Sequence, residues 1–361
     1  MKINYTSIRF VVIFLVAFGF HQTAQAQDPH FSQFYAAPLQ MNPALTGVFS
    51  GEYRFIANYR TQNYAVLGNQ AYRSIAASFE GRRQASRDDY YSFGIAALRD
   101  QVGTSNFSQS RAVVSGSYLK HLGSGVSRGS SQFLVGGAQL GVAQWTYDFN
   151  DLWFSEQFTV SGDNRDAFID FAAASGEAGN LLSTETDMFM EFNAGLLYYY
   201  VKDETNSFYL GGAMHHLTEP NVSFLDNQNE TLHRRWVAQA GGQLELNREV
   251  SLLPAVAVMS QASSFLAIGG MNLRYSNNDW REVAIRAGLW GRVVNQLEDA
   301  MGLDAVVVSA ILEMERWQFG LNYDITVSGL SEANNARGAF ELSLIYVHPA
   351  KQRYRTVCPK F

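Results

Sequence analysis

Short segments in which aromatic or apolar residues alternate with polar ones recur along this chain. Successive side chains of a β-strand point to opposite faces, so each such segment can form a strand with one apolar and one polar face. The clearest case is the segment 52–60, in which Tyr53, Phe55, Ala57 and Tyr59 share one face and Arg54, Ile56, Asn58 and Arg60 share the other. One face suits lipid and the other suits water. The repeated pattern predicts an all-β fold, namely a transmembrane antiparallel β-barrel in an outer membrane.

The N-terminus has the order of a secretory signal peptide. Lys2 and Arg9 precede the apolar run 10–20, and Ala24 and Ala26 supply the small residues of a cleavage site. The apolar run is too short for a membrane anchor, which needs roughly 20 residues. We therefore predict that residues 1–26 are a cleaved signal peptide and that the protein is exported.

Composition is consistent with a membrane protein built from strands. Hydrophobic residues make up 47% of the chain, yet no run beyond the signal is long and apolar enough for a membrane helix. Charged residues make up only 17%, against a usual fraction of about 25%. A large soluble β-protein can share this composition, so that alternative stays open.

Charge and cysteine content narrow the function classes. The formal net charge is -6, and removing Lys2 and Arg9 makes it two units more negative, which argues against nucleic acid as a partner. Cys358 is the single cysteine, so no intrachain disulfide can form.

The alternation and the Gly, Asn, Asp and Ser clusters between segments predict about 14 strands. Their approximate ranges are 52–60, 72–80, 90–99, 109–121, 131–145, 187–201, 206–215, 232–245, 249–260, 263–275, 281–293, 302–312, 317–324 and 338–347. An even number lets the first and last strands pair antiparallel, which closes the sheet and leaves no unpaired edge in lipid.

The connections between these segments predict which way the barrel faces. Most even-numbered connections in the second half are short, such as 202–205, whereas the odd ones include the long segments 146–186 and 216–231. Bacterial barrels have short periplasmic turns and longer external loops. We therefore expect a barrel over 52–347 with its termini on the periplasmic side and the region 146–186 outside.

The segment 27–51 precedes the first predicted strand. Pro29, Pro38 and Pro43 keep it out of a central strand. Its aromatic and apolar residues would be poorly placed in a free tail, so we expect the segment to pack. It is either a plug against the periplasmic mouth of the lumen, which we favour, or a docking site for a periplasmic partner.

Several irregular segments carry a resemblance to a known family. Residues 27–47 read QDPHFSQFYAAPLQMNPALTG, residues 211–221 read GGAMHHLTEPN, and the closing segments 323–331 and 340–344 read YDITVSGLS and FELSL. With the terminal CPKF of 358–361, these segments closely resemble the PorP/SprF family of the Bacteroidetes type IX secretion and gliding machinery. The likeness spans the mature chain but is poor in the region 146–186.

The resemblance implies a function that the alternation cannot supply. It implies a non-enzymatic outer-membrane component of the type IX machinery, which supports export or surface attachment of large adhesin-like cargo proteins. The implied partners are outer-membrane lipid, the cargo protein, and a periplasmic type IX ring or peptidoglycan-associated lipoprotein. The alternative is an outer-membrane channel, or porin, for small solutes or hydrophobic compounds.

The candidate partner-binding residues lie in three segments outside the regular strands. The N-terminal segment contributes Asp28, Pro29, Phe31, Gln33, Phe34, Tyr35, Asn42 and Pro43, the middle motif contributes His216, Leu217, Thr218, Pro220 and Asn221, and the basic tail 348–361 contributes Lys351, Arg353, Arg355 and Phe361. The tail holds no acid, so it suits an acidic partner or an anionic lipid surface, or else it is a disordered end.

Two clusters invite a metal-site interpretation that we do not favour. Acidic residues dominate the region 147–187. This region could bind calcium or a basic partner, or it could simply be a solvated loop. The stretch 163–166 lacks the ligand spacing of an EF-hand, which argues against calcium. His215, His216 and His233 should meet at one rim, but adjacent strand residues face opposite ways. We expect structural histidines whose partners are Thr218 and Glu219, and no metal.

The sequence holds no motif for a hydrolase, a phosphate-binding loop, a zinc protease or a paired-cysteine site. A pair at the rim such as His216 and Ser223 could in principle serve a barrel enzyme, but similar pairs can be found on most loops. We therefore expect no catalytic residues and no cofactor.

Overall fold

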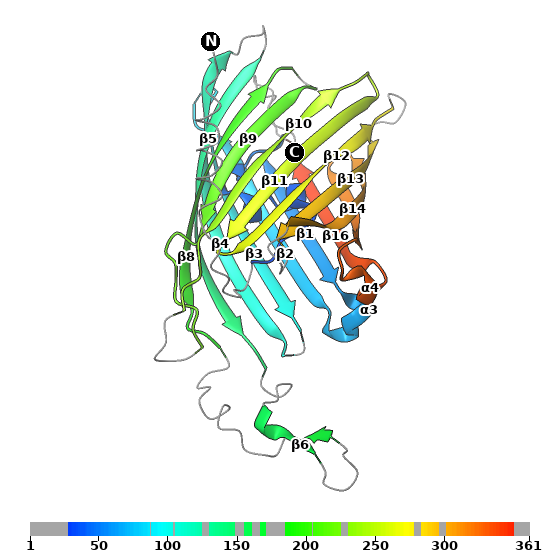
Figure 1. Ribbon diagram of the computed structural model, residues 1–361. Helices are drawn as coiled ribbons and strands as arrows, with labels where there is room; N and C mark the ends of the chain where they lie inside the picture. The colour runs from blue at the N-terminus through cyan, green and yellow to red at the C-terminus, as the bar shows by residue number, and fades with distance from the viewer. Residues whose placement is uncertain are drawn as a thin grey trace, which may run out of the picture.

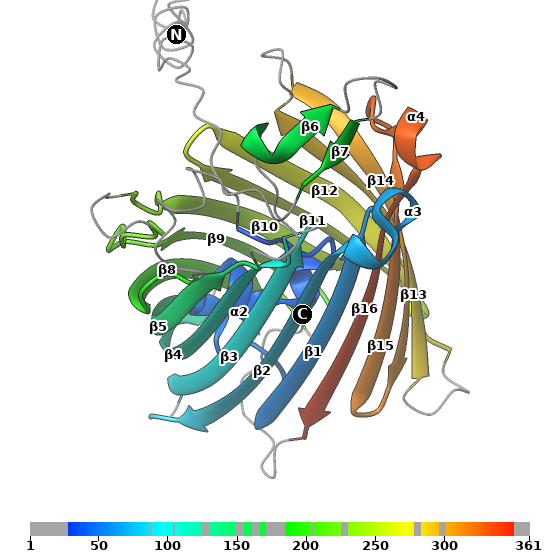
Figure 2. The same ribbon diagram turned by 90° about the horizontal axis from the view of Figure 1, so that it is seen from below.

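The computed structural model describes residues 28–349, except for 87, 104, 125–129, 149–154, 161–166, 171–184, 204, 225–229, 278–282 and 296–300. The described chain forms a closed antiparallel β-barrel (Figures 1 and 2). Each barrel strand pairs with the barrel strand that follows it, and β1 pairs with β16 to close the sheet. This arrangement confirms the predicted fold.

The barrel strands match the predicted segments one to one, with ends that differ by a few residues. They are β1 (Tyr53–Gln62), β2 (Tyr72–Gln84), β3 (Tyr90–Val102), β4 (Phe107–Ser124), β5 (Ser131–Thr146), β8 (Phe189–Val201), β9 (Ser207–His215), β10 (Arg235–Glu245), β11 (Val250–Gln261), β12 (Ser264–Tyr275), β13 (Val283–Asn295), β14 (Met301–Met314), β15 (Trp317–Thr326) and β16 (Arg337–His348).

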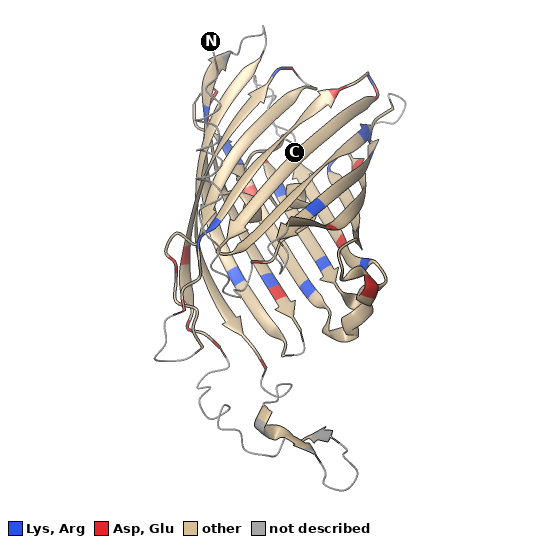
Figure 3. Cartoon of the chain, in the orientation of Figure 1, with Lys and Arg blue, Asp and Glu red and all other residues tan. Residues whose placement is uncertain are grey.

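The two faces of the strands differ as the alternation requires. In β3 the outward side chains of Tyr91, Phe93 and Ile95 are 49%, 43% and 55% exposed, while Ala96 and Leu98 point inward and are buried. Charged residues are sparse along the strands (Figure 3). The outer surface is therefore apolar and suits the hydrocarbon of a membrane.

The two ends of the barrel differ in their connections. At one end the connections are short, as at 202–206, 246–249 and 315–316, and we call this the short-turn end. The other end, which we call the long-loop end, carries the connections 147–188 and 216–234. Since strands alternate in direction, β1 begins at the short-turn end and finishes at the long-loop end.

The connections at the long-loop end contain short elements of their own. Two one-turn helices, α3 (Tyr64–Leu67) and α4 (Ser331–Asn334), lie side by side there (Figures 1 and 2), and η3 (Gly68–Gln70) follows α3. The connection between β5 and β8 contains η5 (Ser155–Gln157) and a hairpin of β6 (Phe158–Val160) and β7 (Ala167–Ile169). The sequence did not predict this hairpin. No described helix is long and apolar enough to cross a membrane.

The chain preceding β1 lies inside the barrel (Figure 2). It contains η1 (Phe34–Ala36), α2 (Pro38–Met41) and η2 (Pro43–Leu45), and we call residues 28–51 the luminal segment. Ala44 and Val48 have no exposed surface. Phe34, Met41, Leu45 and Val48 pack in one buried cluster with inward wall residues such as Leu197 and Trp290, so the segment covers part of the face that the alternation assigned to water.

Candidate functional site: the luminal segment and its cavity

The luminal segment begins at the long-loop end with a buried ion cluster. The Oδ2 atom of Asp28 lies 2.7 Å from His216 Nε2, 2.9 Å from Arg235 Nη1 and 3.4 Å from Arg111 Nη1. Glu191 adds a second carboxylate, 3.4 Å from His216 Nδ1 and 3.7 Å from Arg111 Nη1. All five side chains are at most 9% exposed. A buried charge is tolerated only with partners, and each group here has them.

The protonation of this cluster follows from its contacts. Burial raises the pKa of Asp28, but His216, Arg235 and Arg111 together hold it well below the ordinary value of 3.8. Burial lowers the pKa of His216, but Asp28 and Glu191 bring it above the ordinary value of 6.5. Both shifts favour the charged form of the group, so the contact between Asp28 and His216 favours an ion pair.

A second buried cluster holds the next residues against β1, β13, β15 and β16. The backbone N–H groups of Ser32 and Gln33 donate to the Glu341 carboxylate at 2.8 Å each. Arg60 lies 3.0 Å from both Glu341 and Asp324. These side chains are fully buried, and they tie the start of the segment to strands at the far end of the sequence.

The middle of the segment is held by an asparagine. Asn42 Nδ2 donates to the carbonyl oxygens of Leu196 at 3.2 Å and Gly212 at 3.1 Å, while its Oδ1 accepts from the Ala44 amide at 2.8 Å. Asn42 thereby caps η2, which begins at Pro43, and fixes it to β8 and β9. Close approach is possible because β5 has a glycine here, since a Cβ at Gly137 would overlap the Pro43 carbonyl.

The segment reaches the short-turn end just before β1. The Gly47 amide donates to Glu80 Oε2 at 2.8 Å, and Arg54 pairs with the same carboxylate at 2.8 Å. The Gly51 carbonyl accepts from Arg82 Nη2 at 3.1 Å. The segment therefore runs along the lumen from the long-loop end to the short-turn end, whereas we had expected packing at one mouth.

An aromatic cluster packs the segment against the wall opposite β4 and β5. The rings of Phe34 and Tyr35 each lie 5.6 Å from the ring of Trp290 on β13, measured between centroids. Trp290 is 2% exposed. Aromatic rings bury a large apolar area, so this contact adds apolar packing to the polar anchors.

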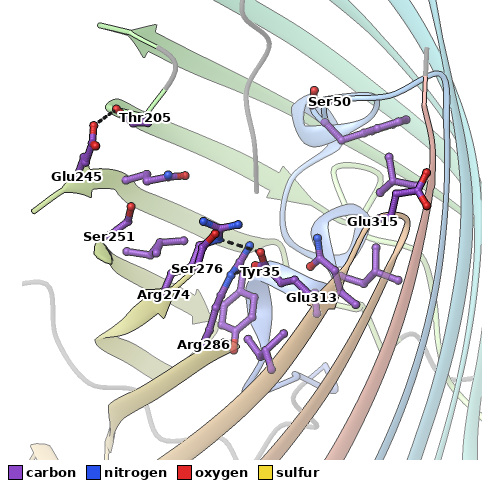
Figure 4. A pocket seen from close by; sticks show the side chains of 18 of the residues that line it. Tyr35, Ser50, Thr205, Glu245, Ser251, Arg274, Ser276, Arg286, Glu313 and Glu315 are labelled. Atoms are coloured by element: carbon purple, nitrogen blue, oxygen red, sulfur yellow. Dashed lines mark hydrogen bonds and ion pairs between the residues drawn. The ribbon is translucent and has the colours of Figure 1, made fainter. Parts of the chain in front are cut away.

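A cavity of about 350 Å³ remains between the segment and the wall near the short-turn end (Figure 4). Its inner lining includes Gln33, Tyr35 and Phe49 of the luminal segment. Its mouth includes residues of the short turns, namely Thr205, Glu245, Asn247, Arg248, Glu249, Ser276 and Glu315. The volume falls in the usual range of binding pockets.

The wall of this cavity carries charge. Glu313 on β14 pairs with Arg274 on β12 at 2.8 Å and with Arg286 on β13. Gln33 is 1% exposed; its Oε1 accepts from Ser343, but its Nε2 has no hydrogen-bond partner. The cavity therefore presents an unused buried donor beside two guanidinium groups.

Comparison with protein families identifies the chain. A family model described as "Type IX secretion system membrane protein PorP/SprF" matches residues 23–346. The chain belongs to the PorP/SprF family. Together with the closed barrel, this family places the protein in the outer membrane as a component of the type IX secretion system. The family consists of membrane proteins of a secretion system and is not an enzyme family.

Solved structures similar to this PorP/SprF barrel include channels and transporters for aromatic hydrocarbons. The Pseudomonas putida toluene transporter TodX has 10% identity and a TM-score of 0.44, with 90% of this chain and 99% of that chain covered. The CymD monoaromatic hydrocarbon channel has 11% identity and a TM-score of 0.43, with 87% and 93% covered. The Ralstonia pickettii toluene transporter TbuX has 11% identity and a TM-score of 0.42, with 86% and 91% covered. No curated protein matches the sequence.

The structure brings together some candidate residues of this PorP/SprF chain. Asp28 meets His216, and Asn42 meets the strand that carries the middle motif. Six of the candidate residues are buried inside the lumen, namely Phe31, Gln33, Phe34, Asn42, Pro43 and His216. Enclosed residues can hold the luminal segment but cannot meet a partner protein without rearrangement.

Other candidates lie outside the lumen or outside the described chain. The Leu217 amide donates to the Phe192 carbonyl, Thr218 Oγ1 donates to the Met190 carbonyl, and the Pro220 carbonyl accepts from the Leu232 amide, so these residues fasten the loop after β9. Asn221 forms an isolated bridge with Thr231. The signal peptide 1–26 and the tail residues Lys351, Arg353, Arg355 and Phe361 fall outside the described residues.

The histidine prediction was wrong about the partners of the rings. His215 Nε2 lies 3.1 Å from the Met41 carbonyl and His216 contacts Asp28, so the partners come from the luminal segment rather than from Thr218 and Glu219. Among the described residues, no group of three potential ligands is placed to hold a metal ion.

Sequence reasoning missed the wall residues that complete both ion clusters. These are Arg111, Glu191, Arg235, Arg292, Asp324 and Glu341. Each is a buried or nearly buried charged residue at an inward position of a barrel strand. That position was the available signal, but it does not reveal which charge meets which.

Proposed function

We propose that this PorP/SprF protein supports the export or surface attachment of specific large, adhesin-like cargo proteins, including gliding adhesins. The observation that carries the proposal is the match of the family model to residues 23–346. The filled lumen supports a docking role rather than a conducting one, because residues 31–49 occupy the path that a cargo chain would need.

The long-loop end is the surface we assign to cargo. Bacterial barrels place long loops outside and short turns in the periplasm. Tyr64 and Val66 on α3 are 59% and 50% exposed, and Leu330 before α4 is 45% exposed. Adjacent exposed apolar side chains often mark contact sites between proteins. The short-turn end then faces a periplasmic type IX ring or a peptidoglycan-associated lipoprotein.

The first experiment deletes the gene and compares the surface proteome by quantitative mass spectrometry. We expect the loss of one or a few very large surface proteins, while unrelated outer-membrane proteins remain. An unchanged surface proteome would contradict the proposal.

A second experiment locates the cargo contact in the complemented strain. A variant with Tyr64→Ser, Val66→Ser and Leu330→Ser should restore less surface cargo than the wild-type gene. The matched control is Leu246→Ser, because Leu246 is 60% exposed but lies at the short-turn end. Equal restoration by both variants would remove the long-loop end as the cargo surface.

The channel alternative predicts a different measurement. The purified barrel should then conduct small ions in a planar bilayer without any partner. We expect no conductance, since the luminal segment spans the lumen. Steady conductance of the wild-type protein would favour a channel.

A further inference from the structure

The cavity near the short-turn end continues into a smaller cavity deeper in the lumen. The smaller cavity has a volume of about 50 Å³, and Tyr35, Gln243, Leu253 and Arg286 line both cavities. Its other lining residues include the aromatic and apolar side chains of Tyr199, Tyr209, Pro254, Ala255 and Trp290. We call the larger cavity the chamber and the smaller one the recess. A ligand that enters the chamber from the short-turn end can therefore place an apolar group in the recess.

Two buried donors beside these cavities have no hydrogen-bond partner among the described residues. One is Nε2 of Gln33, which lines the chamber, and the other is Nε1 of Trp290, which lines the recess. Gln33 is 1% exposed and Trp290 is 2% exposed. A buried donor without an acceptor costs free energy. Both positions therefore favour a ligand that supplies acceptor oxygens.

The charged residues of the chamber are equal in number but separated in space. Four arginines and four glutamates line it. On the wall, Arg274 and Arg286 share the single carboxylate of Glu313. The third arginine of the wall, Arg54, is paired with Glu80. The wall of the described chain therefore keeps one guanidinium charge in excess.

The mouth of the chamber has the opposite excess. Glu245 and Glu249 lie there with a single arginine, Arg248, while Glu315 is paired with Arg316 at 3.2 Å. Figure 4 shows Glu245 beside Thr205 and apart from Arg286 on the wall. A ligand with a carboxylate at the wall and an ammonium group at the mouth would match both charges.

We propose that the chamber binds a short peptide through its free carboxyl terminus. The carboxylate pairs with Arg286, a backbone carbonyl accepts from Gln33 Nε2, and the α-ammonium group lies at the mouth beside Glu245 and Glu249. The recess takes the last side chain, which must be small and apolar, as in alanine, because the recess has only about 50 Å³. The proposal does not use cargo binding, so its failure leaves the proposed function unchanged.

The first test measures the binding of trialanine to the purified full-length barrel by isothermal titration calorimetry. Trialanine amide lacks the carboxylate and should bind at least tenfold more weakly, because a hydrogen bond to a charged group is lost inside the barrel. Acetylated trialanine lacks the ammonium group and should bind about two- to fivefold more weakly, because the mouth is exposed. No binding of trialanine up to millimolar concentrations, or equal binding of the amide, would overturn the proposal.

The second test changes the residues assigned to the ligand. Arg286→Gln should weaken trialanine binding at least tenfold and should remove the preference for trialanine over its amide. The matched control is Arg337→Gln, since Arg337 is exposed at the long-loop end. If Arg286→Gln kept the affinity and the preference of the wild-type protein, the proposal would be wrong.

A gentler variant keeps the test valid if Arg286→Gln does not fold. Trp290→Phe retains an aromatic ring but removes the buried donor, and it should weaken trialanine binding about two- to tenfold. Its control is Trp317→Phe, because Trp317 is 41% exposed and lies outside both cavities. The heat-induced gel shift of the barrel checks the folding of each variant. Equal affinities of Trp290→Phe and Trp317→Phe would count against the proposed site.

Two sources can provide this chemistry, namely a free peptide and the carboxyl-terminal end of a protein. A soluble carrier protein that ends in three alanines distinguishes them in the same assay. Binding of the carrier within about fivefold of trialanine, the loss expected without the ammonium group, would identify a protein terminus as the ligand. Binding of trialanine alone would identify a free peptide. The proposal fails if neither binds.

Discussion

Replacing Asp28 by Asn tests whether buried charges anchor the luminal segment. When His216 is protonated, the form that its raised pKa favours, the cluster contains three cationic groups, Arg111, Arg235 and His216, and two carboxylates, Asp28 and Glu191. Asp28→Asn keeps the shape of the side chain but leaves three buried cations facing one carboxylate. Removing one partner of a buried ion pair costs about 3–5 kcal/mol. Since about 1.4 kcal/mol is a factor of ten, opening of the segment should become roughly 100- to 3,000-fold more frequent.

Amide hydrogen exchange of the purified barrel measures this opening. The Leu45 amide donates to the Asn42 carbonyl at 2.9 Å and the Val48 amide to the Leu45 carbonyl at 3.1 Å. These amides should exchange faster by the stated factor, whereas amides of β12, which do not contact Asp28, should keep their rates. The double variant Asp28→Asn with Arg235→Gln restores the original excess of one cation, so its defect should be smaller than the sum of the single defects. Unchanged exchange in Asp28→Asn, or strictly additive defects, would refute the anchoring role.

Two further predictions concern the same segment. Gly137→Ala should destabilise the packed segment by about 1–3 kcal/mol in thermal unfolding, because the added Cβ would overlap the Pro43 carbonyl. The control is the neighbouring Gly136→Ala, whose added Cβ would meet no atom closer than 3.7 Å. The control should change the stability by less than about 0.5 kcal/mol. The stability of the packed segment should also depend on pH at both ends of the range. Because the pKa of His216 is raised, its contribution is full below pH 6.5 and is lost as the pH rises through the pKa of the folded protein. Because the pKa of Asp28 is lowered, its contribution is present above pH 3.8 and is lost as the pH falls through the pKa of the folded protein. Exchange rates corrected for intrinsic pH effects should therefore rise towards alkaline pH, and a flat profile up to pH 9 would contradict the pairing.

The barrel strands could be predicted because their signal is local and periodic. In the strand 53–62 the outward residues Phe55 and Tyr59 were assigned correctly to lipid from a window of a few residues. The inward residues were assigned to water for the same reason, since alternation says which side chains share a face but not what covers that face. Arg60 is instead 2% exposed and contacts the luminal segment.

The luminal segment could be predicted only in part. Its prolines and aromatic residues indicated a packed, irregular structure before the first strand, and the structure has such elements in η1, α2 and η2. Its path through the lumen depends on pairs such as Asp28 with His216, which are 188 positions apart. No periodicity connects such residues, so a single sequence contains no signal for their pairing.

The distribution of anchors along the segment determines how it can move. Its first residues are held by two buried ion clusters at the long-loop end, around Asp28 and around Glu341. Its last part has Glu80 as a charged anchor, but it borders the cavity near the short-turn end. Apolar packing alone would allow the segment to slide along the lumen, whereas buried ion pairs fix one register because each displaced charge loses its partner. A ligand that enters the cavity from the short-turn end therefore reaches the less restrained part of the segment, while release of the whole segment requires separation of the ion pairs at the opposite end.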